Sequence, residues 1–409
     1  MFDLEKWREI YDVFKANKLR TFLTSFSVSW GIFMLIILLG AGKGLRNGFE
    51  YDFRDDAINS VWLRPGQLSM PFRGMQSGRR IKFTNEDFDM IGRAYEEVDH
   101  ITGRYAMWSV PVEYNNEVNT LNFRGVHPDH KFLENTEVTR GRYISNVDLQ
   151  EVRKVAVIGI ETKQALFGEK EALGEYITIF KIPFKVVGIF EDSGGRWENS
   201  MIYLPVTTAQ KVFNAKNELN RIMFTTGDAS NERVSTLVED LRLQLSDRLL
   251  FDPSDERALH IHNNVQEFAL FNSIFTGINA FVWIIGIMTL IAGVVGISNI
   301  MMITVKERTK EIGIRKALGA TPNSITTMIL MEAVVVTSIA GYTGLVLGVF
   351  GLEYLSSFTK DPGTFMNPGV DFGVAFSAAV LLVIFGTIAG LIPAMKASRV
   401  KPIVALRDE

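Results

Sequence analysis

Four long apolar stretches stand out from a chain of otherwise mixed character. One lies near the start and three lie in the last third, at residues 21–43, 274–304, 325–352 and 370–392. About 20 apolar residues are enough to cross the hydrocarbon core of a bilayer, and each stretch is at least that long. The pattern therefore predicts four transmembrane helices.

The first stretch has an alternative interpretation as a cleaved signal peptide. Its uncharged run is longer than the apolar core of a usual signal peptide. It also follows an amphipathic segment, residues 1–20, where apolar side chains have the spacing of one helix face: Trp7, Ile10, Tyr11 and Phe14. We therefore expect an uncleaved span, preceded by a helix lying in the membrane interface rather than packed on a soluble partner.

Residues 44–273 have a different pattern, with short apolar runs and polar turns. Residues 45–59 are expected to continue the first span as a stalk helix. Helical spacing predicts amphipathic helices at 85–95 and 231–245, and Asn115 with Asn116 predicts a hairpin turn. The expected strands cover residues 61–64, 110–114, 121–126, 155–158, 176–180, 184–190, 201–204 and 221–226. This mixture predicts an α+β domain with two subdomains, the second around residues 137–214.

Basic residues are distributed unevenly around the apolar stretches. They gather before the first span and in residues 305–324 and 393–409, whereas residues 353–369 contain one basic residue, Lys360. By the positive-inside rule this predicts cytoplasmic termini and an outward-facing middle domain. The expected fold class is a membrane protein with four transmembrane α-helices and a large α+β extracytoplasmic domain inserted between helices 1 and 2.

Composition argues against several functional classes. The net charge is −3, and no basic face indicates a nucleic-acid partner. The chain has no cysteine, which excludes disulfides, thiol catalysis and cysteine-ligated zinc. His127 and His130 lie close in sequence, as do His260 and His262, but no ligand set that closes a metal site can be identified. We expect no catalytic residue and no metal site.

The segment at residues 303–325 is the most informative part of the chain. It is abruptly charged between two apolar stretches, and a loop that only sets topology would explain that charge. Such a loop does not require the ordered motif Glu311-Ile-Gly-Ile-Arg-Lys-Ala-Leu-Gly-Ala320. After Thr321-Pro322, Asn323 or Ser324 is expected to cap the next helix.

This segment resembles the cytoplasmic coupling segment of ABC-transporter permeases of the macrolide-exporter family, which is MacB-like and FtsX-like. The similarity includes Gly296-Ile-Ser-Asn-Ile-Met-Met302 and a C-terminal motif from Ala389 to Arg407. It is strong over residues 274–407 and weak in the middle domain. The resemblance implies an inner-membrane protein with a periplasmic core domain, working as a homodimer with a cytoplasmic ABC ATPase.

The resemblance also implies that the charged segment docks in a groove of that ATPase. Polar contacts are expected from Glu311, Arg315 and Lys316, and apolar contacts from Ile312, Ile314 and Leu318. The full set of expected coupling residues is Glu307, Glu311, Ile312, Gly313, Ile314, Arg315, Lys316, Leu318 and Gly319.

The chain itself is expected to bind no cofactor. Gly40-Ala-Gly-Lys-Gly44 looks like the end of a phosphate-binding loop, but Ile37 stands where that loop needs its first glycine. Gly44 also stands where the loop needs Ser or Thr, and the segment lies in a span rather than after a strand. ATP and Mg would therefore be used by the separate ATPase subunit, and the chain is not expected to be an enzyme.

Small residues recur at four-residue spacing in the last three spans, which favours close helix packing in lipid. The expected packing residues are Ala292, Gly296, Gly344, Gly348, Gly386 and Gly390, together with Ala340. Glu332 is the acidic residue well inside a span. A structural role is favoured over a proton relay, because no ionisable partner lies at similar depth in the other spans.

The expected function is that of an exporter permease working by mechanotransmission in the lipid bilayer. The cargo would be a hydrophobic compound, antibiotic or peptide, with a periplasmic adaptor and an outer-membrane channel as further partners. One alternative is a non-transporting signalling or scaffold permease that regulates a cell-wall hydrolase, and another is a lipoprotein-release permease. A membrane-anchored enzyme is a third alternative, which predicts activity from residues 44–273 alone.

Overall fold

The computed structural model describes residues 18–53, 56–359 and 363–401. The chain forms two compact units, one comprising Tyr51–Ser273 and the other the residues before and after it. The amphipathic helix expected over residues 1–20 lies outside the described residues, apart from its last three positions.

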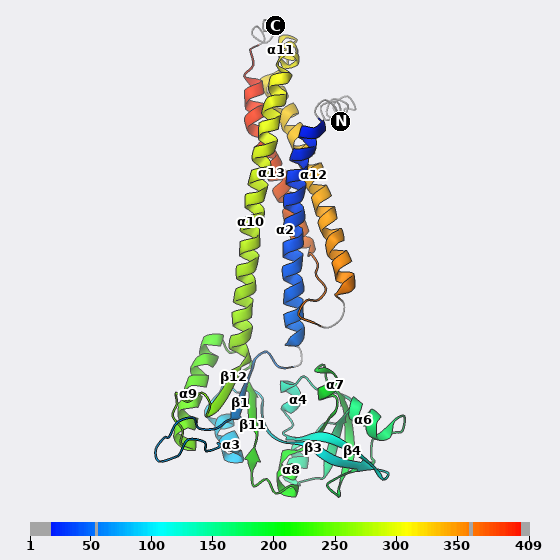
Figure 1. Cartoon of the computed structure of the whole chain (residues 1–409), viewed down its shortest axis with the longest axis vertical. Coiled ribbons are helices and arrows are strands. Elements are labelled where there is room, and N and C mark those ends of the chain that lie inside the picture. Colours follow the sequence, from blue (N-terminus) through cyan, green and yellow to red (C-terminus); the bar gives the residue numbers. More distant parts are fainter. Residues whose placement is uncertain (1–17, 54–55, 360–362, 402–409) are drawn as a thin grey trace. The chain divides into compact units, whose positions relative to one another are not determined.

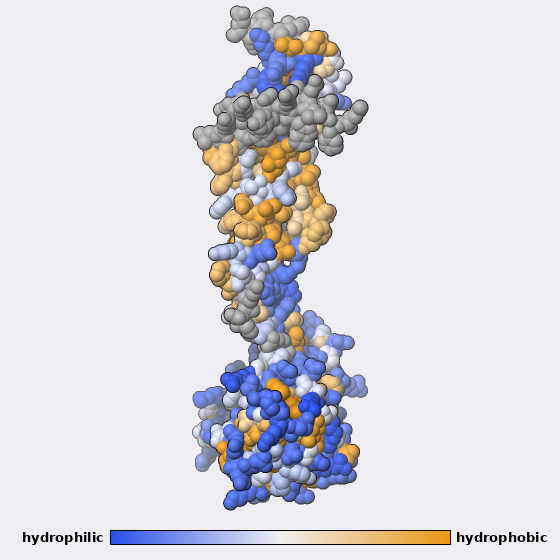
Figure 2. Space-filling view, turned by 90° about the vertical axis from the view of Figure 1, so that its right-hand side faces the viewer, coloured by the Kyte–Doolittle hydropathy of each residue, from blue (hydrophilic) through white to orange (hydrophobic). Residues whose placement is uncertain are grey.

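The helical unit contains long helices whose apolar sequences match the expected spans (Figure 1). Among the described residues, four helices are long and apolar enough to cross a membrane. On the face shown in Figure 2, hydrophobic residues gather over the middle of these helices, whereas hydrophilic residues cover most of the other unit. The expected fold class is therefore confirmed. The helices are α2 (Lys18–Asp52), α10 (Asn264–Glu307), α11 (Thr309–Ala317), α12 (Pro322–Phe358) and α13 (Phe372–Ser398).

The prediction of a stalk helix over residues 45–59 is wrong for the second half of that range. Helix α2 ends at Asp52, and Asn59 lies in a turn. The backbone N–H of Ala57 donates to Leu133 O, and the Asn59 side chain donates to Gly227 O. These tertiary hydrogen bonds take the place of the helical ones that would have extended α2.

Close contacts at glycines hold the helical unit together. A Cβ added to Gly344 would lie 2.1 Å from Ser29 O of α2, and one added to Gly348 would lie 2.7 Å from Ile36. Gly390 approaches Ala333 of α12 in the same way. Because lipid tails are as apolar as the side chains, such close approach is what allows helices to associate in a membrane.

The Tyr51–Ser273 unit contains a ten-stranded sheet and several helices. All eight expected strands and both expected helices are present, so these predictions are confirmed. The strands are β1 (Ser60–Pro65), β2 (Phe83–Thr84), β3 (Ile101–Tyr114), β4 (Glu117–Val126), β5 (Glu137–Gly141), β6 (Val155–Gly159), β7 (Tyr176–Ile179), β8 (Ile182–Glu191), β9 (Met201–Pro205), β10 (Glu218–Leu219), β11 (Arg221–Thr225) and β12 (Leu259–Asn263). The helices are α3 (Asn85–Ala94), α4 (His130–Leu133), α5 (Asn146–Gln150), α6 (Ile160–Phe167), α7 (Gly195–Glu198), α8 (Val206–Val212) and α9 (Asn231–Leu249).

Six strands of this unit close into a ring. Strand β3 pairs with β4, β4 with β9, β9 with β6, β6 with β8, β8 with β7, and β7 again with β3. Val112, Phe123 and Ile202 belong to one buried cluster inside this part of the fold. The subdomain expected around residues 137–214 therefore omits two of its strands, because β3 and β4 come earlier in the chain.

Outside the ring, the sheet continues through β12, β1, β11 and the first half of β3, and this part packs against α3 and α9. The buried apolar residues of α9 are Val234, Leu237, Leu241 and Leu245, whose helical spacing confirms the expected amphipathic helix. Thr84 caps α3 through a capping box with Asp87. Asn115 and Asn116, with φ of 47° and 69°, form the expected tight turn of the β3–β4 hairpin.

A buried ionic cluster joins strands of the ring to α4. Glu134 accepts hydrogen bonds from Arg104 Nη1 and Arg124 Nη1, each at 2.7 Å, and from Tyr203 Oη at 3.1 Å. Burial by itself raises the pKa of Glu134, but His130 and the two arginines outweigh it and hold that pKa well below its ordinary value. The buried carboxylate is therefore ionised, and both of its oxygens accept hydrogen bonds.

Candidate functional site

The charged segment between the second and third spans folds as a short separate helix. Figure 1 shows α11 beyond the end of α10. Arg308 lies between them with φ −96° and ψ 15°, and its N–H still donates to Thr304 O. The Thr309 hydroxyl donates to the carbonyls of Val305 and Lys306. The chain therefore changes direction here without leaving the end of α10 unsatisfied.

The end of α11 has the geometry of a Schellman motif. The N–H of Ala320 donates to Arg315 O and the N–H of Gly319 to Lys316 O. Gly319 has φ +100°, a conformation that favours glycine. This accounts for the second glycine of the sequence motif by backbone geometry.

Helix α12 begins two residues earlier than a cap at Asn323 would require, and three earlier than a cap at Ser324 would. Its N-cap is Thr321, whose hydroxyl accepts from the N–H of Ser324 at 3.3 Å. The expected cap residues are therefore wrong. Pro322 occupies the first helical position, where its fixed φ suits the helix and its missing N–H costs nothing.

Two side chains of α11 attach the helix to the rest of the helical unit. Ile312 is 3% exposed and belongs to the same buried cluster as Ile325 and Ile329 of α12. Lys316 Nζ donates to Ser398 O and Val400 O, each at 2.7 Å, at the end of α13. A cation at the carbonyl end of a helix satisfies its last acceptors and interacts favourably with its dipole.

Arg308 connects the start of α11 to a buried acid on α12. Its Nε donates to Glu311 Oε2 at 2.8 Å, and its Nη1 lies 3.7 Å from Glu332 Oε2. Glu332 is 5% exposed. An ionisable partner for Glu332 therefore exists, although sequence analysis looked for one only within the spans. Arg308 reaches it from just outside the second span.

The face of α11 that lies opposite Ile312 and Lys316 is exposed. Leu318 is 84% exposed and Ile314 is 43% exposed, so both apolar side chains are available to a partner. Glu311 is exposed as well, and positions 311, 314 and 318 have the spacing of one helical stripe. Glu307, the last residue of α10 before the change of direction at Arg308, is also exposed. We call these four residues the open face of α11.

The structure thus divides the expected coupling residues into two groups. Glu307, Glu311, Ile314 and Leu318 lie on the open face, whereas Ile312 and Gly313 are buried. Lys316 is occupied with α13, and Arg315 Nη1 contacts Met328 Sδ at 2.7 Å. The motif therefore serves both to hold α11 in place and to present a surface. The sequence pattern does not separate these two roles, because anchoring residues and exposed residues alternate along the same short helix.

The expected packing residues are divided in a similar way. Gly344 and Gly348 face α2, while Gly386 and Gly390 face α12. Ala292 is exposed and Gly296 is half-buried. Contacts of α10 with α2 are made instead at Gly286 and Gly293, where an added Cβ would meet Leu35 and Val28. These two glycines are not among the expected packing residues, although their seven-residue spacing is a signal in the sequence.

The phosphate-loop-like residues 40–44 lie inside helix α2, where no phosphate cradle can form. Among the described residues, no group of three or more His, Cys, Asp or Glu side chains is placed to hold a metal ion. His127 is half-buried and stacks on Phe88, and its Nδ1 accepts from the N–H of Gly103 at 3.0 Å. His260 and His262 are exposed on β12.

Two protein families match the chain. The MacB-like periplasmic core domain matches residues 21–241. The FtsX-like permease C-terminal domain matches residues 283–402, which include α11 and its open face.

Curated relatives are similar over almost the whole chain. The macrolide export ATP-binding/permease protein MacB of Bdellovibrio bacteriovorus is 29% identical, over 99% of this chain and 62% of the relative. The pyoverdine export ATP-binding/permease protein PvdT of Pseudomonas savastanoi pv. phaseolicola is 29% identical, over 98% of this chain and 58% of the relative. The chain therefore spans less than two thirds of either relative. Among solved structures, the periplasmic region of MacB from Actinobacillus actinomycetemcomitans matches with a TM-score of 0.45 and 18% identity, over 54% of this chain and 96% of that structure.

Proposed function

This chain belongs to the family of MacB-like permeases with an FtsX-like C-terminal domain, and on that premise we propose that it is the transmembrane permease subunit of an ABC-type exporter. ATP would be hydrolysed, with Mg, by an ABC ATPase on a partner subunit. The relatives named for macrolide and pyoverdine export support an exported cargo that is a hydrophobic compound, antibiotic or peptide.

The observation that carries this proposal is the open face of α11. An exposed leucine and isoleucine gain favourable transfer free energy when a partner covers them, and α11 is held from behind by Ile312 and Lys316. A helix that is anchored on one side and apolar on the other is suited to receive force from a docked protein. Leu318 and Ile314 would enter the ATPase groove, and Glu311 and Glu307 would contact its polar rim.

We propose that motion at α11 is passed outward through α10. Helix α10 has 44 residues, which correspond to a length of about 66 Å. That is roughly twice the thickness of the hydrocarbon core. Cargo would be handled by the periplasmic domain of a homodimer, with an adaptor and an outer-membrane channel, rather than passed through a wet pore in the spans.

The orientation that this proposal requires can be tested by cysteine labelling, because the chain has no native cysteine. With a membrane-impermeant maleimide, Leu243→Cys on α9 should react in intact spheroplasts. Leu318→Cys should react only after the membrane is opened. Both leucines are more than half exposed, so access to the reagent, not burial, would determine the result. Labelling of Leu318→Cys in sealed spheroplasts would contradict a cytoplasmic open face.

The coupling itself can be tested by purifying the tagged full chain from its native membrane in a mild detergent. We expect an ABC ATPase to co-purify with the unaltered chain and to be lost with Leu318→Asp, since an apolar pocket would have to accept a charge. Glu311→Ala should weaken the association further. Leu243→Asp is the matched control, because it makes the same change at an exposed leucine of the other unit.

Retention of the ATPase by a Leu318→Asp/Glu311→Ala double variant would refute docking at the open face. Absence of any ATPase from the unaltered preparation would refute the permease proposal as a whole. A cell-wall hydrolase in place of an adaptor in the purified complex would redirect the proposal from export to signalling. Thermal unfolding of each variant shows whether loss of the partner follows from loss of fold.

A further inference from the structure

The sheet of the Tyr51–Ser273 unit carries a row of basic side chains across four neighbouring strands. Arg64 of β1 pairs with His260 of β12, and Arg221 of β11 pairs with Arg104 of β3. The β1–β11 register, in which Leu63 pairs with Ile222, puts Arg64 beside Arg221. Directly opposed residues point to the same face of a sheet, so four groups that are or can become cationic share one line.

Like charges placed opposite each other on a sheet destabilise it, so this row needs a reason. Arg104 is compensated, because it donates to the buried Glu134. For Arg64 and Arg221, no carboxylate lies within ion-pair distance among the described residues. Burial, with repulsion from nearby arginines, lowers the pKa of Arg221 to about 10, a value at which it is still cationic at neutral pH.

These arginines line one groove of about 900 Å³, a size typical of small-molecule sites. A third arginine, Arg242 of α9, is also part of the lining. Its Nη2 donates to Leu259 O at 2.9 Å, while its buried Nη1 has no hydrogen-bond acceptor in the described structure. Three guanidinium groups therefore face the groove, against one lining carboxylate, Glu256.

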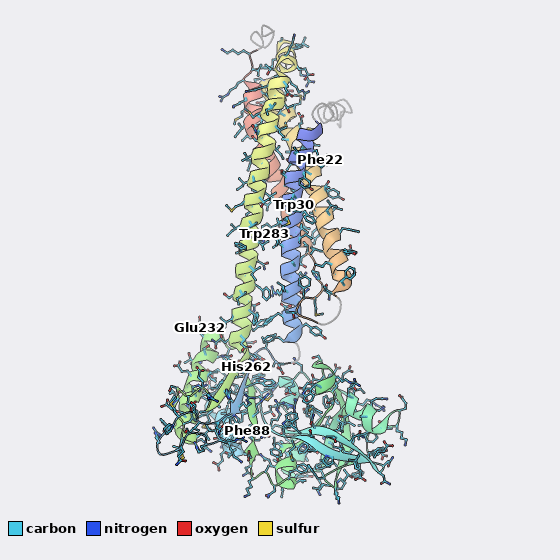
Figure 3. All side chains as sticks on the ribbon, in the orientation of Figure 1. Phe22, Trp30, Phe88, Glu232, His262 and Trp283 are labelled. Atoms are coloured by element: carbon cyan, nitrogen blue, oxygen red, sulfur yellow. The ribbon has the colours of Figure 1, made fainter. Side chains whose placement is uncertain are left out.

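Trp62 fixes part of this arrangement. The Arg221 guanidinium lies over the indole, 5.0 Å from its centroid, which is a cation–π contact. The indole N–H donates to Ser60 Oγ at 2.8 Å, so the ring itself is held. Pro253 and the exposed His262, which is labelled in Figure 3, also line the groove. The groove thus has a preorganised cationic part and an apolar part.

We propose that this groove binds a small organic anion, in which a phosphate or carboxylate is attached to an apolar body. Arg64 and Arg221 hold the oxyanion, because planar guanidinium groups match its geometry with paired hydrogen bonds. Arg242 adds a third positive charge to the lining, and Trp62 is a positioning residue that keeps Arg221 aimed into the groove. The apolar body lies against Pro253 and Trp62, which line the same groove.

The test is calorimetric titration of the full chain in phosphatidylcholine nanodiscs, with empty nanodiscs as the blank. The probes are 1-naphthyl phosphate, 1-naphthoate, inorganic phosphate and a short-chain phosphatidic acid. We expect saturable binding of at least one naphthyl probe with a Kd of about 1 mM or tighter. Arg64→Gln/Arg221→Gln should weaken it by about tenfold or more. Arg257→Gln, an exposed neighbour outside the lining, should leave it unchanged.

A second readout covers the possibility of misfolding. Because the double variant removes opposed like charges, it should unfold at the same temperature as the unaltered chain or higher, most clearly at low salt. Equal binding by the double variant, or no saturable binding of either naphthyl probe, would overturn the proposal. Inorganic phosphate binding as tightly as 1-naphthyl phosphate would overturn its apolar part. Preference for the phosphatidic acid would assign the groove to a lipid headgroup instead. The titration contains no ATPase, so its outcome is independent of docking at α11.

Discussion

Replacing Gly344 by alanine should force α2 and α12 apart. The added Cβ would lie 2.1 Å from Ser29 O and 2.9 Å from Ser29 C, both backbone atoms of α2 that cannot rotate away. Relieving this contact requires the helices to separate by about 1 Å, and overpacking of this kind costs about 1–3 kcal/mol. Alanine recovers up to about 1 kcal/mol through its better helix propensity. The net effect is destabilising.

Gly277→Ala is the matched control, because it lies inside α10 and its added Cβ would have no described atom within 4 Å. It gains the same propensity without the clash and should stabilise the helix by up to about 1 kcal/mol. The difference between the two variants therefore isolates the overpacking, at about 1–3 kcal/mol. For a unit of this size that corresponds to roughly 2–10 °C in the unfolding midpoint.

The assay is thermal unfolding of the full chain in one detergent, with both variants prepared in parallel. Hydrogen exchange of the peptide that contains Ser29 locates the effect, since faster exchange is expected there only for Gly344→Ala. If Gly344→Ala raised the midpoint as much as Gly277→Ala, or left exchange around Ser29 unchanged, the close contact between α2 and α12 would be refuted.

Three further results are expected. Lys316→Met removes both hydrogen bonds to the end of α13 and should destabilise that contact by about 1–3 kcal/mol, seen as faster amide exchange at residues 396–400; normal exchange would refute it. Glu134→Gln leaves Arg104 buried without its anion and should cost about 3–5 kcal/mol in denaturant unfolding. Burial, together with Glu134 and Glu198, raises the pKa of Asp192 from its ordinary 3.8 to about 6. Between these two pH values the folded state holds a proton that the unfolded state releases. The free energy of unfolding therefore falls as pH rises from about 4 through 6. Asp192→Asn should therefore become more stable relative to the unaltered chain over that range, by up to about 3 kcal/mol, and parallel stability curves of the two proteins would contradict this.

Much of the fold could be predicted because it depends on neighbours along the chain. The four spans follow from uninterrupted apolar length, and α9 follows from the spacing of Leu237, Leu241 and Leu245. The β3–β4 turn follows from Asn115 and Asn116, since asparagine tolerates positive φ. The family resemblance was carried by α11 and its surroundings, where the sequence motif is long and ordered.

Tertiary structure alone determined how these pieces are used. The ring closes through a β7–β3 pairing between residues more than sixty positions apart, and the row formed by Arg64, Arg221 and His260 exists only once three distant strands are in register. Likewise Lys316 reaches carbonyls more than eighty residues away. Periodicity reports which face of an element is apolar, because hydropathy is a property of each residue. It does not report which element covers that face, because packing depends on shape and register between segments that the sequence separates.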